Sequence, residues 1–342
     1  MSVDIVRAFR LAKAGVERLP GPVTRALFDA VADGAWAARV GGVRQLEANL
    51  ARLRPDLSPA ALRRASRANM RAYMRYYREA FELPQASVAQ LGARVHVVGD
   101  AALRAELAAG RSVVVALSHS GNWDLAGAWA EKYLGHVVTV AEHLQPEELF
   151  QGFLDFRTGL GMTIIPLEKG GSVFRELVRH VRTSASIVPL LADRDLSRTG
   201  VEVDLGGHRA RVAPGPAALA LATSRPLHAA MIRHERLSGA RRRAAGGPWG
   251  IVIEFSERLD RPGDSVEQLS QRWVDWVAGR NRRHPEAWHM LQKVFVEDLD
   301  PERLARSRAR APEPSAATPD GAVPGEAPAG SLSEASDAPG RA

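Results

Sequence analysis

Residues 112–129 read SVVVALSHSGNWDLAGAW, and this stretch decides the class of fold. Ser112–Leu117 is a short apolar run rich in β-branched residues, which is typical of a strand buried on both faces. The Ser-His-Ser-Gly-Asn segment that follows is rich in turn-forming residues, and a helix is expected to begin near Trp123. A strand, a turn and a helix in this order indicate a sheet that is covered by helices.

The same alternation continues on both sides of this stretch. Six further apolar runs are predicted as strands: Val95–Val98, Val137–Val140, Thr163–Pro166, Ile187–Leu191, Leu227–Ile232 and Ile251–Phe255. The predicted helices between them are Ala101–Ala109, Trp123–Tyr133, Pro146–Leu160, Ser172–Val181 and Pro216–Thr223. Val201–Leu205 and His208–Val212 flank Gly206-Gly207, which predicts a hairpin. We therefore expect an α/β fold with a mainly parallel central sheet flanked by helices.

The ends of the chain differ from this core. Residues 1–92 are expected to form a helical N-terminal part, in which Ser58-Pro59 reads as an N-cap followed by Pro at the first helical position. Ser265–Arg283 is expected to form the last amphipathic helix. The prediction is one domain over residues 1–305, with the α/β core at 93–305. Residues 306–342 are rich in Pro, Ala, Gly, Ser and acidic residues, and are expected to be disordered.

Composition limits the chemistry. The chain of 342 residues contains no cysteine, which excludes disulfides, a thiolate nucleophile and Cys-ligated metal sites. Its apolar runs are too short for a transmembrane helix, and charges interrupt the N-terminus where a signal peptide needs a continuous apolar segment. The formal net charge is +7, which favours anionic partners such as nucleic acid, acidic lipid or phosphorylated small molecules. An arginine-rich solvated surface explains the charge equally well.

His119 and Asp124 are the first candidates for a catalytic site. His119 follows the predicted strand Ser112–Leu117, where residues line the crevice of an α/β sheet. Asp124 comes five positions later, so its carboxylate can fold back and stabilise an imidazolium that forms when His119 takes a proton. The spacing alone is common, because His143 and Glu148 repeat it. The Gly-Asn turn after a buried strand favours His119 over a helix-capping histidine.

Other catalytic motifs are missing from the sequence. Ser118 and Ser120 do not lie in the G-x-S-x-G nucleophile elbow. The sequence also has no P-loop, no G-x-G-x-x-G fingerprint and no convincing metal-ligand spacing.

At HSGNWD the chain resembles the bacterial lipid A lauroyl-type acyltransferase superfamily, and within it the phosphatidylinositol mannoside acyltransferases of actinobacteria. The resemblance runs in order over roughly the first 300 residues. An Ala- and Arg-rich composition is also typical of actinobacterial coding sequences. Further blocks that look like the family's are VRQLEANLARL, YMRYYREAFELP, VVTVAEHL, FLDFRTGLGMTIIPL, PLLADRDLSRTGVEVDLGG and VAPGPAALALATSRPL.

The resemblance implies a glycerolphosphate-acyltransferase-like fold and a reaction without metal or cofactor. The donor would be a long-chain acyl-CoA, typically palmitoyl-CoA, as co-substrate. The acceptor would be the mannose 6-hydroxyl of a phosphatidylinositol mono- or dimannoside. The enzyme would be peripheral, on the anionic cytoplasmic face of the inner membrane, with no nucleic-acid partner. The oligomeric state stays open, with a monomer favoured.

The resemblance also implies roles for individual residues. His119 would be the general base, and both Asp124 and Asp193 are candidates for the acid that orients it. Glu142 and Arg157 match family positions on the acceptor side, with structural ion pairs as the alternative. Arg194 is a candidate contact for an anionic headgroup or the CoA phosphates, with a solvated surface position as the alternative.

Two other functions remain open from the sequence. The first is an acyltransferase with a different acceptor, such as a lysophospholipid or a lipid A precursor. The second is a non-catalytic protein that binds anionic lipid or nucleic acid through its basic surface.

Overall fold

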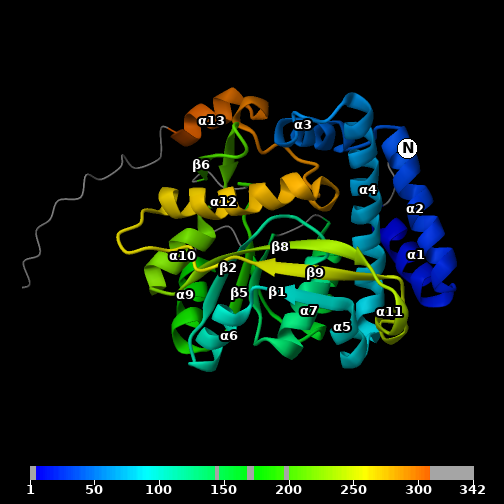
Figure 1. The fold of residues 1–342 in the computed structure, drawn as a ribbon, viewed down its shortest axis with the longest axis horizontal. Coiled ribbons are helices and arrows are strands. Elements are labelled where there is room, and N and C mark those ends of the chain that lie inside the picture. Colours follow the sequence, from blue (N-terminus) through cyan, green and yellow to red (C-terminus); the bar gives the residue numbers. More distant parts are fainter. Residues whose placement is uncertain (1–4, 143–145, 168–172, 196–199, 309–342) are drawn as a thin grey trace, which may run out of the picture.

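The computed structural model describes residues 5–142, 146–167, 173–195 and 200–308 (Figure 1). It has the mixed α/β architecture that the sequence predicts, with a mainly parallel central sheet and N-terminal helices. The N-terminal helices are α1 (Ile5–Arg18), α2 (Gly21–Ala37), α3 (Val43–Leu53) and α4 (Pro59–Glu82), followed by the 3-10 helix η1 (Leu83–Gln85) and α5 (Val88–Arg94).

The central sheet has five strands in the order β1-β9-β8-β2-β5. The strands are β1 (Val95–Val98), β2 (Val113–Leu117), β5 (Ile187–Leu191), β8 (Leu227–Arg236) and β9 (Trp249–Phe255). Every neighbouring pair is parallel except β8 and β9, which are antiparallel. The parallel pair β3 (Val138–Glu142) and β4 (Thr163–Leu167) lies beyond β5, to which a parallel bridge between Val137 and Ile187 connects it.

Helices cover both faces of this sheet (Figure 1). Alternate β2 residues point to opposite faces, as the pleat requires, and all five are buried. Val114 and Ala116 belong to a core shared with α9 (Val173–Thr183), α10 (Gly215–Thr223) and α12 (Val266–Arg283). Val113, Val115 and Leu117 belong to a second core shared with α5, α6 (Ala101–Ala108) and α7 (Trp123–Tyr133). The uninterrupted apolar run in the sequence is therefore a strand with two buried faces.

The predicted elements are present, with end points that differ by a few residues. The hairpin consists of β6 (Val201–Asp204) and β7 (Arg209–Val212), which pair antiparallel. The helix predicted at Pro146–Leu160 is α8 (Glu147–Gly159). Two short α-helices were not predicted: α11 (Gly239–Ala244), between β8 and β9, and α13 (Pro301–Arg308). The predicted tail starts at 306, inside α13, and residues 309–342 lie outside the described residues.

Among the described helices, none is both long enough and apolar enough to cross a bilayer.

Candidate active site

The register of two parallel strands brings His119 and Asp193 together. Leu117 at the end of β2 pairs with Leu191 at the end of β5. The ladder extends by one more hydrogen bond, from Ala192 N–H to Leu117 O at 2.9 Å. His119 and Asp193 each lie two residues beyond the Leu117–Leu191 pair, so both residues emerge at the same edge of the sheet.

The side chains of His119 and Asp193 are in direct contact. His119 Nδ1 lies 2.5 Å from Asp193 Oδ1, and the backbone N–H of His119 donates to Asp193 Oδ2 at 3.0 Å. The His119 side chain is 25% exposed, whereas that of Asp193 is only 6% exposed. The buried carboxylate therefore holds Nδ1, and Nε2 is the nitrogen left to meet a substrate. This is the base–orienter arrangement of Ser-His-Asp triads.

Asp193 is held as a carboxylate. Burial alone raises the pKa of a carboxyl group, but the His119 ring, the Trp288 indole and the His119 backbone N–H outweigh it, so the pKa of Asp193 lies below its ordinary value. Trp288 Nε1 donates to Asp193 Oδ2 at 2.7 Å. An ionised Asp193 can stabilise the imidazolium that forms when His119 takes a proton.

Asp124, the other candidate for the orienting acid, faces elsewhere. Tyr76 OH donates to Asp124 Oδ2 at 2.7 Å, and Arg157 Nε donates to Asp124 Oδ1 at 2.7 Å. Asp124 itself is only 2% exposed. The carboxylate in contact with the His119 ring is therefore that of Asp193, and the expected fold-back of Asp124 onto the imidazole is not what the structure shows. Instead, Asp124 links α7 to α4 and α8.

Arg157 stays charged beside Asp124. Burial lowers the pKa of Arg157, but Asp124 and Tyr76 together outweigh it, so the pKa lies above the ordinary arginine value. Burial and the Asp124 charge together raise the pKa of Tyr76 well above its ordinary value, so Tyr76 remains a hydrogen-bond donor. The structure thus shows the ion pair that the sequence offered as the alternative role of Arg157.

Two further candidates lie near the ends of strands. Glu142 is the last residue of β3, and its side chain lies outside the described part of the chain, as does His143 of the second His-x4-acid pair. Arg194 directly follows Asp193. Burial raises the pKa of Tyr73, and the Tyr77 hydrogen bond and the positive charge of Arg194 oppose that rise, which places Arg194 near Tyr73 of α4.

The turn from β2 into α7 depends on the Gly-Asn pair. Gly121 has a φ of +60°, and a Cβ at that position would lie 2.6 Å from the Ile232 carbonyl carbon. Asn122 caps α7 by accepting from Leu125 N–H at 2.9 Å, and its amide donates to the buried Glu79 Oε2 at 2.8 Å. This local chemistry fixes where the strand ends, and hence where His119 lies.

Sequence reasoning missed Tyr76 and Trp288 as partners of the two carboxylates. Tyr76 was seen only within a helical block, and Trp288 lies in a segment to which no motif drew attention. Within the described residues, no group of three or more His, Asp or Glu side chains is close enough to hold a metal ion.

Comparison with known proteins identifies the family. The model for the bacterial lipid A biosynthesis acyltransferase family matches residues 8–297. The chain belongs to this family. The resemblance stated from the sequence is thereby confirmed, and membership of this acyltransferase family supports O-acyl transfer as the reaction.

Two named relatives are similar over nearly their whole length. The phosphatidylinositol mannoside acyltransferase of Mycolicibacterium smegmatis is 38% identical over 294 residues, which cover 85% of this chain and 91% of the relative. The protein of the same name from Mycobacterium tuberculosis H37Rv is 38% identical over 300 residues, covering 86% and 90%. A solved structure, the 1-acyl-sn-glycerophosphate acyltransferase PlsC from Thermotoga maritima, aligns with a TM-score of 0.36 and 13% identity, covering 76% of this chain and 97% of its own.

Proposed function

We propose that this acyltransferase moves a long-chain acyl group, typically palmitoyl, from acyl-CoA to the mannose 6-hydroxyl of phosphatidylinositol mannosides. The observation that carries the proposal is the contact between His119 and the buried Asp193 at the carboxyl ends of β2 and β5. The choice of acceptor is supported by the two mycobacterial relatives that are named for it.

In the proposed mechanism, His119 is a general base. Nε2 takes the proton of the sugar hydroxyl while the hydroxyl oxygen attacks the thioester carbonyl carbon. Asp193 stabilises the imidazolium that results. The tetrahedral intermediate collapses by breaking the C–S bond, and the imidazolium returns its proton to the leaving CoA thiolate. Proton transfer of this kind contributes roughly 10²–10⁴-fold, and orientation of the two substrates can contribute roughly 7–11 kcal/mol.

We propose a direct transfer, without an acyl-enzyme intermediate. The two serines beside His119 are buried, with 0% exposure for Ser118 and 1% for Ser120. Ser118 Oγ donates to Ser120 Oγ at 3.1 Å, and Ser120 Oγ accepts from Ile232 N–H at 3.3 Å. The two hydroxyls therefore bond each other and the Ile232 backbone, and among the described residues neither is hydrogen-bonded to a base that could activate it as a nucleophile.

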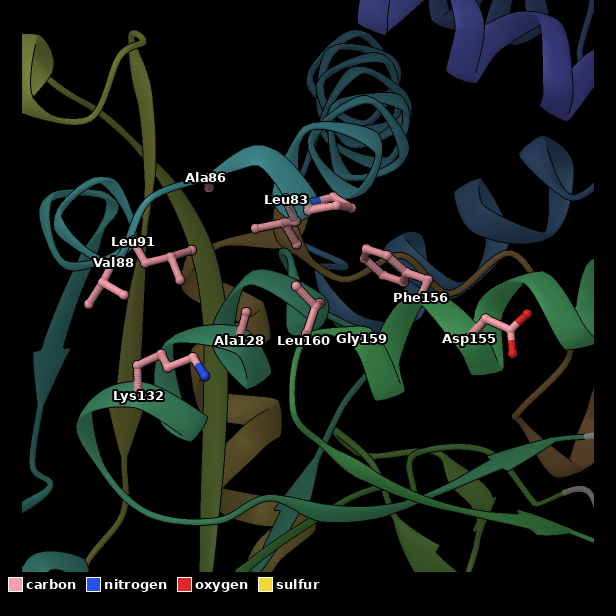
Figure 2. Close-up of a pocket in the computed structure, with 11 residues that line it drawn as sticks. Leu83, Ala86, Val88, Leu91, Ala128, Lys132, Asp155, Phe156, Gly159 and Leu160 are labelled. Atoms are coloured by element: carbon pink, nitrogen blue, oxygen red, sulfur yellow. The ribbon is translucent and has the colours of Figure 1, made fainter.

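Two neighbouring cavities are lined mostly by apolar residues. The larger, of about 290 Å³, is lined by η1, α5, α7 and α8, with Lys132 and Asp155 as its charged lining residues (Figure 2). The smaller is lined mainly by aromatic side chains, among them Phe9, Tyr77 and Phe153. Pro84 and Phe156 line both cavities, and α8 also carries Arg157, which binds Asp124. We assign the fatty chain of a substrate to this region.

We propose that α1 and α2 rest on an anionic membrane surface at the cytoplasmic face. Val23, Leu27 and Val31 repeat every four residues along α2, and all three are about half exposed. Leu11 on α1 is 65% exposed, and α1 also carries four basic residues, namely Arg7, Arg10, Lys13 and Arg18. Exposed apolar side chains beside basic ones are the pattern that binds an acidic lipid interface.

The test is a transfer assay with purified protein and labelled palmitoyl-CoA. The acceptors offered are phosphatidylinositol mono- and dimannosides, a lysophospholipid and a lipid A precursor. We expect labelled mannoside product from the wild type, and none from a folded His119→Ala variant. If labelled product formed only with one of the other acceptors, that lipid would be the acceptor in place of the mannosides. Vesicle or DNA binding without any turnover would show that the chain is not an enzyme of this kind.

A further inference from the structure

A C-terminal segment, residues 287–289, is hydrogen-bonded to the turn that carries His119. Gly121 N–H donates to Ala287 O at 3.0 Å, and His289 N–H donates to His119 O at 2.7 Å. Ser120 and Trp288 form an antiparallel bridge between these two hydrogen bonds. The backbone that directly follows His119, on both sides of Ser120, is therefore tied to residues 287–289, which are some 170 positions away in sequence.

Helix α4 fixes this segment in turn. Asn69, which is 0% exposed, donates from its amide to Pro285 O at 2.9 Å and to Trp288 O at 2.7 Å. Its carbonyl oxygen lies 3.0 Å from His289 Nδ1. Since a buried amide with all these partners has no freedom to turn, the position of the Trp288 backbone is set by the N-terminal helical part.

The Trp288 indole is hydrogen-bonded to the Asp193 carboxylate. Asp193 Oδ2 accepts two hydrogen bonds, from Trp288 Nε1 at 2.7 Å and from His119 N–H at 3.0 Å. Two donors on one oxygen fix the rotation of the carboxylate, and the other oxygen, Oδ1, is left aimed at His119 Nδ1. Trp288 is 0% exposed, so solvent does not compete for this bond.

We infer that Trp288 is a positioning residue for the reaction, which acts through Asp193 on the basicity of His119; this inference rests on the proposed function. The indole N–H stabilises the ionised carboxylate. Its removal leaves a buried carboxylate with one donor fewer, and this makes the His119–Asp193 pair easier to protonate. The neutral imidazole that the reaction needs is then present only at higher pH.

The experiment compares Trp288→Phe with Trp273→Phe as a matched control. Both tryptophans are at most 1% exposed and belong to the same core, so the two variants remove the same atoms from similar surroundings. Within the described residues, Trp273 Nε1 has no hydrogen-bond partner, so Trp273→Phe removes no hydrogen bond. The measurement is kcat/KM for labelled acyl transfer as a function of pH, with the folded fraction of each variant determined in parallel.

We expect Trp288→Phe to lose roughly 10- to 100-fold in kcat/KM at neutral pH, as for one hydrogen bond to a charged group. The acidic limb of its pH profile of kcat/KM should move to higher pH by about one unit. Trp273→Phe should keep the acidic limb of the wild type.

Two results would overturn the inference, provided that the wild type is active: an acidic limb that is unmoved in folded Trp288→Phe, or one that moves equally in both variants. Loss of transfer in the wild type itself would instead overturn the proposed function. If Trp288→Phe does not fold, the pH profile of kcat/KM is measured for Trp288→His, whose ring can still donate a hydrogen bond. If the acidic limb of that variant moved by a full pH unit, the role of the donor would be contradicted.

Discussion

His119 and Asp193 occupy equivalent positions on two adjacent parallel strands, each two residues beyond the register pair Leu117 and Leu191. Their contact is therefore set by backbone hydrogen bonds of the sheet. The 2.5 Å approach of His119 Nδ1 to Asp193 Oδ1 needs no long, flexible side chain. A short carboxylate suffices here, because the strand carries it to the edge where the imidazole emerges.

This relationship predicts a large effect of Asp193→Asn. An amide cannot stabilise the imidazolium and can hold the wrong tautomer, so we expect kcat to fall on the order of 10⁴-fold, as for the equivalent Asp in Ser-His-Asp triads. Asp193→Glu keeps the charge and should retain more activity than Asp193→Asn. Steady-state transfer of labelled acyl groups measures both. If Asp193→Asn retained most of the wild-type rate, Asp193 would not orient the base.

The pair between Arg157 and Asp124 predicts a stability effect that is not additive. Each single change, Asp124→Ala or Arg157→Ala, leaves a buried charge without its counter-ion and should cost about 3–5 kcal/mol of unfolding free energy. The double variant leaves no unpaired charge of this pair, so it should cost less than the sum of the single variants. Urea unfolding of all four proteins measures this coupling. Additive losses would show that the two side chains do not stabilise one another.

The sequence was informative where the determinants are local. The buried run of β2, the Gly-Asn turn and the Asn122 cap of α7 are all encoded within a dozen residues, so the position of His119 could be predicted. The hydrophobic runs likewise revealed the other strands, because burial on both faces leaves a simple pattern.

The partners of His119 and Asp124 depend on sheet order and helix packing, which local patterns do not encode. The sequence left open whether Asp124 or Asp193 orients His119, and the answer lies in the pairing of β2 with β5. Asp124 instead meets Tyr76 from α4, a partner 48 positions away. Trp288 reaches Asp193 across 95 positions, and no pattern in a single sequence points to such a contact.

The turn before α7 predicts that Gly121→Ala will be poorly tolerated. An alanine at φ +60° costs roughly 1–2 kcal/mol, and its Cβ would meet the Ile232 backbone at 2.6 Å. We expect a loss of at least about 2 kcal/mol in unfolding free energy, with reduced transfer because His119 shifts. Gly34→Ala is the control, since a Cβ added at Gly34 would have nothing within 4 Å and α2 should gain from alanine. Equal stabilities of the two variants would contradict the proposed constraint at Gly121.

Buried His289 should make the fold sensitive to acid: it is 3% exposed, and its ring centroid lies 5.3 Å from that of Tyr73. Burial, together with the neighbouring His234, Arg75 and His119 side chains, lowers the pKa of His289 well below its ordinary value. The folded protein therefore keeps His289 neutral, whereas the unfolded chain binds a proton there below about pH 6.5. Between about pH 6.5 and the lower pKa of His289 in the folded protein, the unfolded state binds more protons than the folded state. The stability contributed by neutral His289 is therefore complete above about pH 6.5, and it is lost as the pH falls, by about 1.4 kcal/mol per pH unit.

The variant His289→Phe keeps an aromatic ring and the backbone N–H that donates to His119 O. Its unfolding free energy should therefore fall less steeply than that of the wild type between about pH 6.5 and 5.5. Urea unfolding at about pH 8, where neither state protonates the ring, measures the packing loss separately, and parallel slopes for the two proteins below about pH 6.5 would show that His289 is not held neutral by its burial.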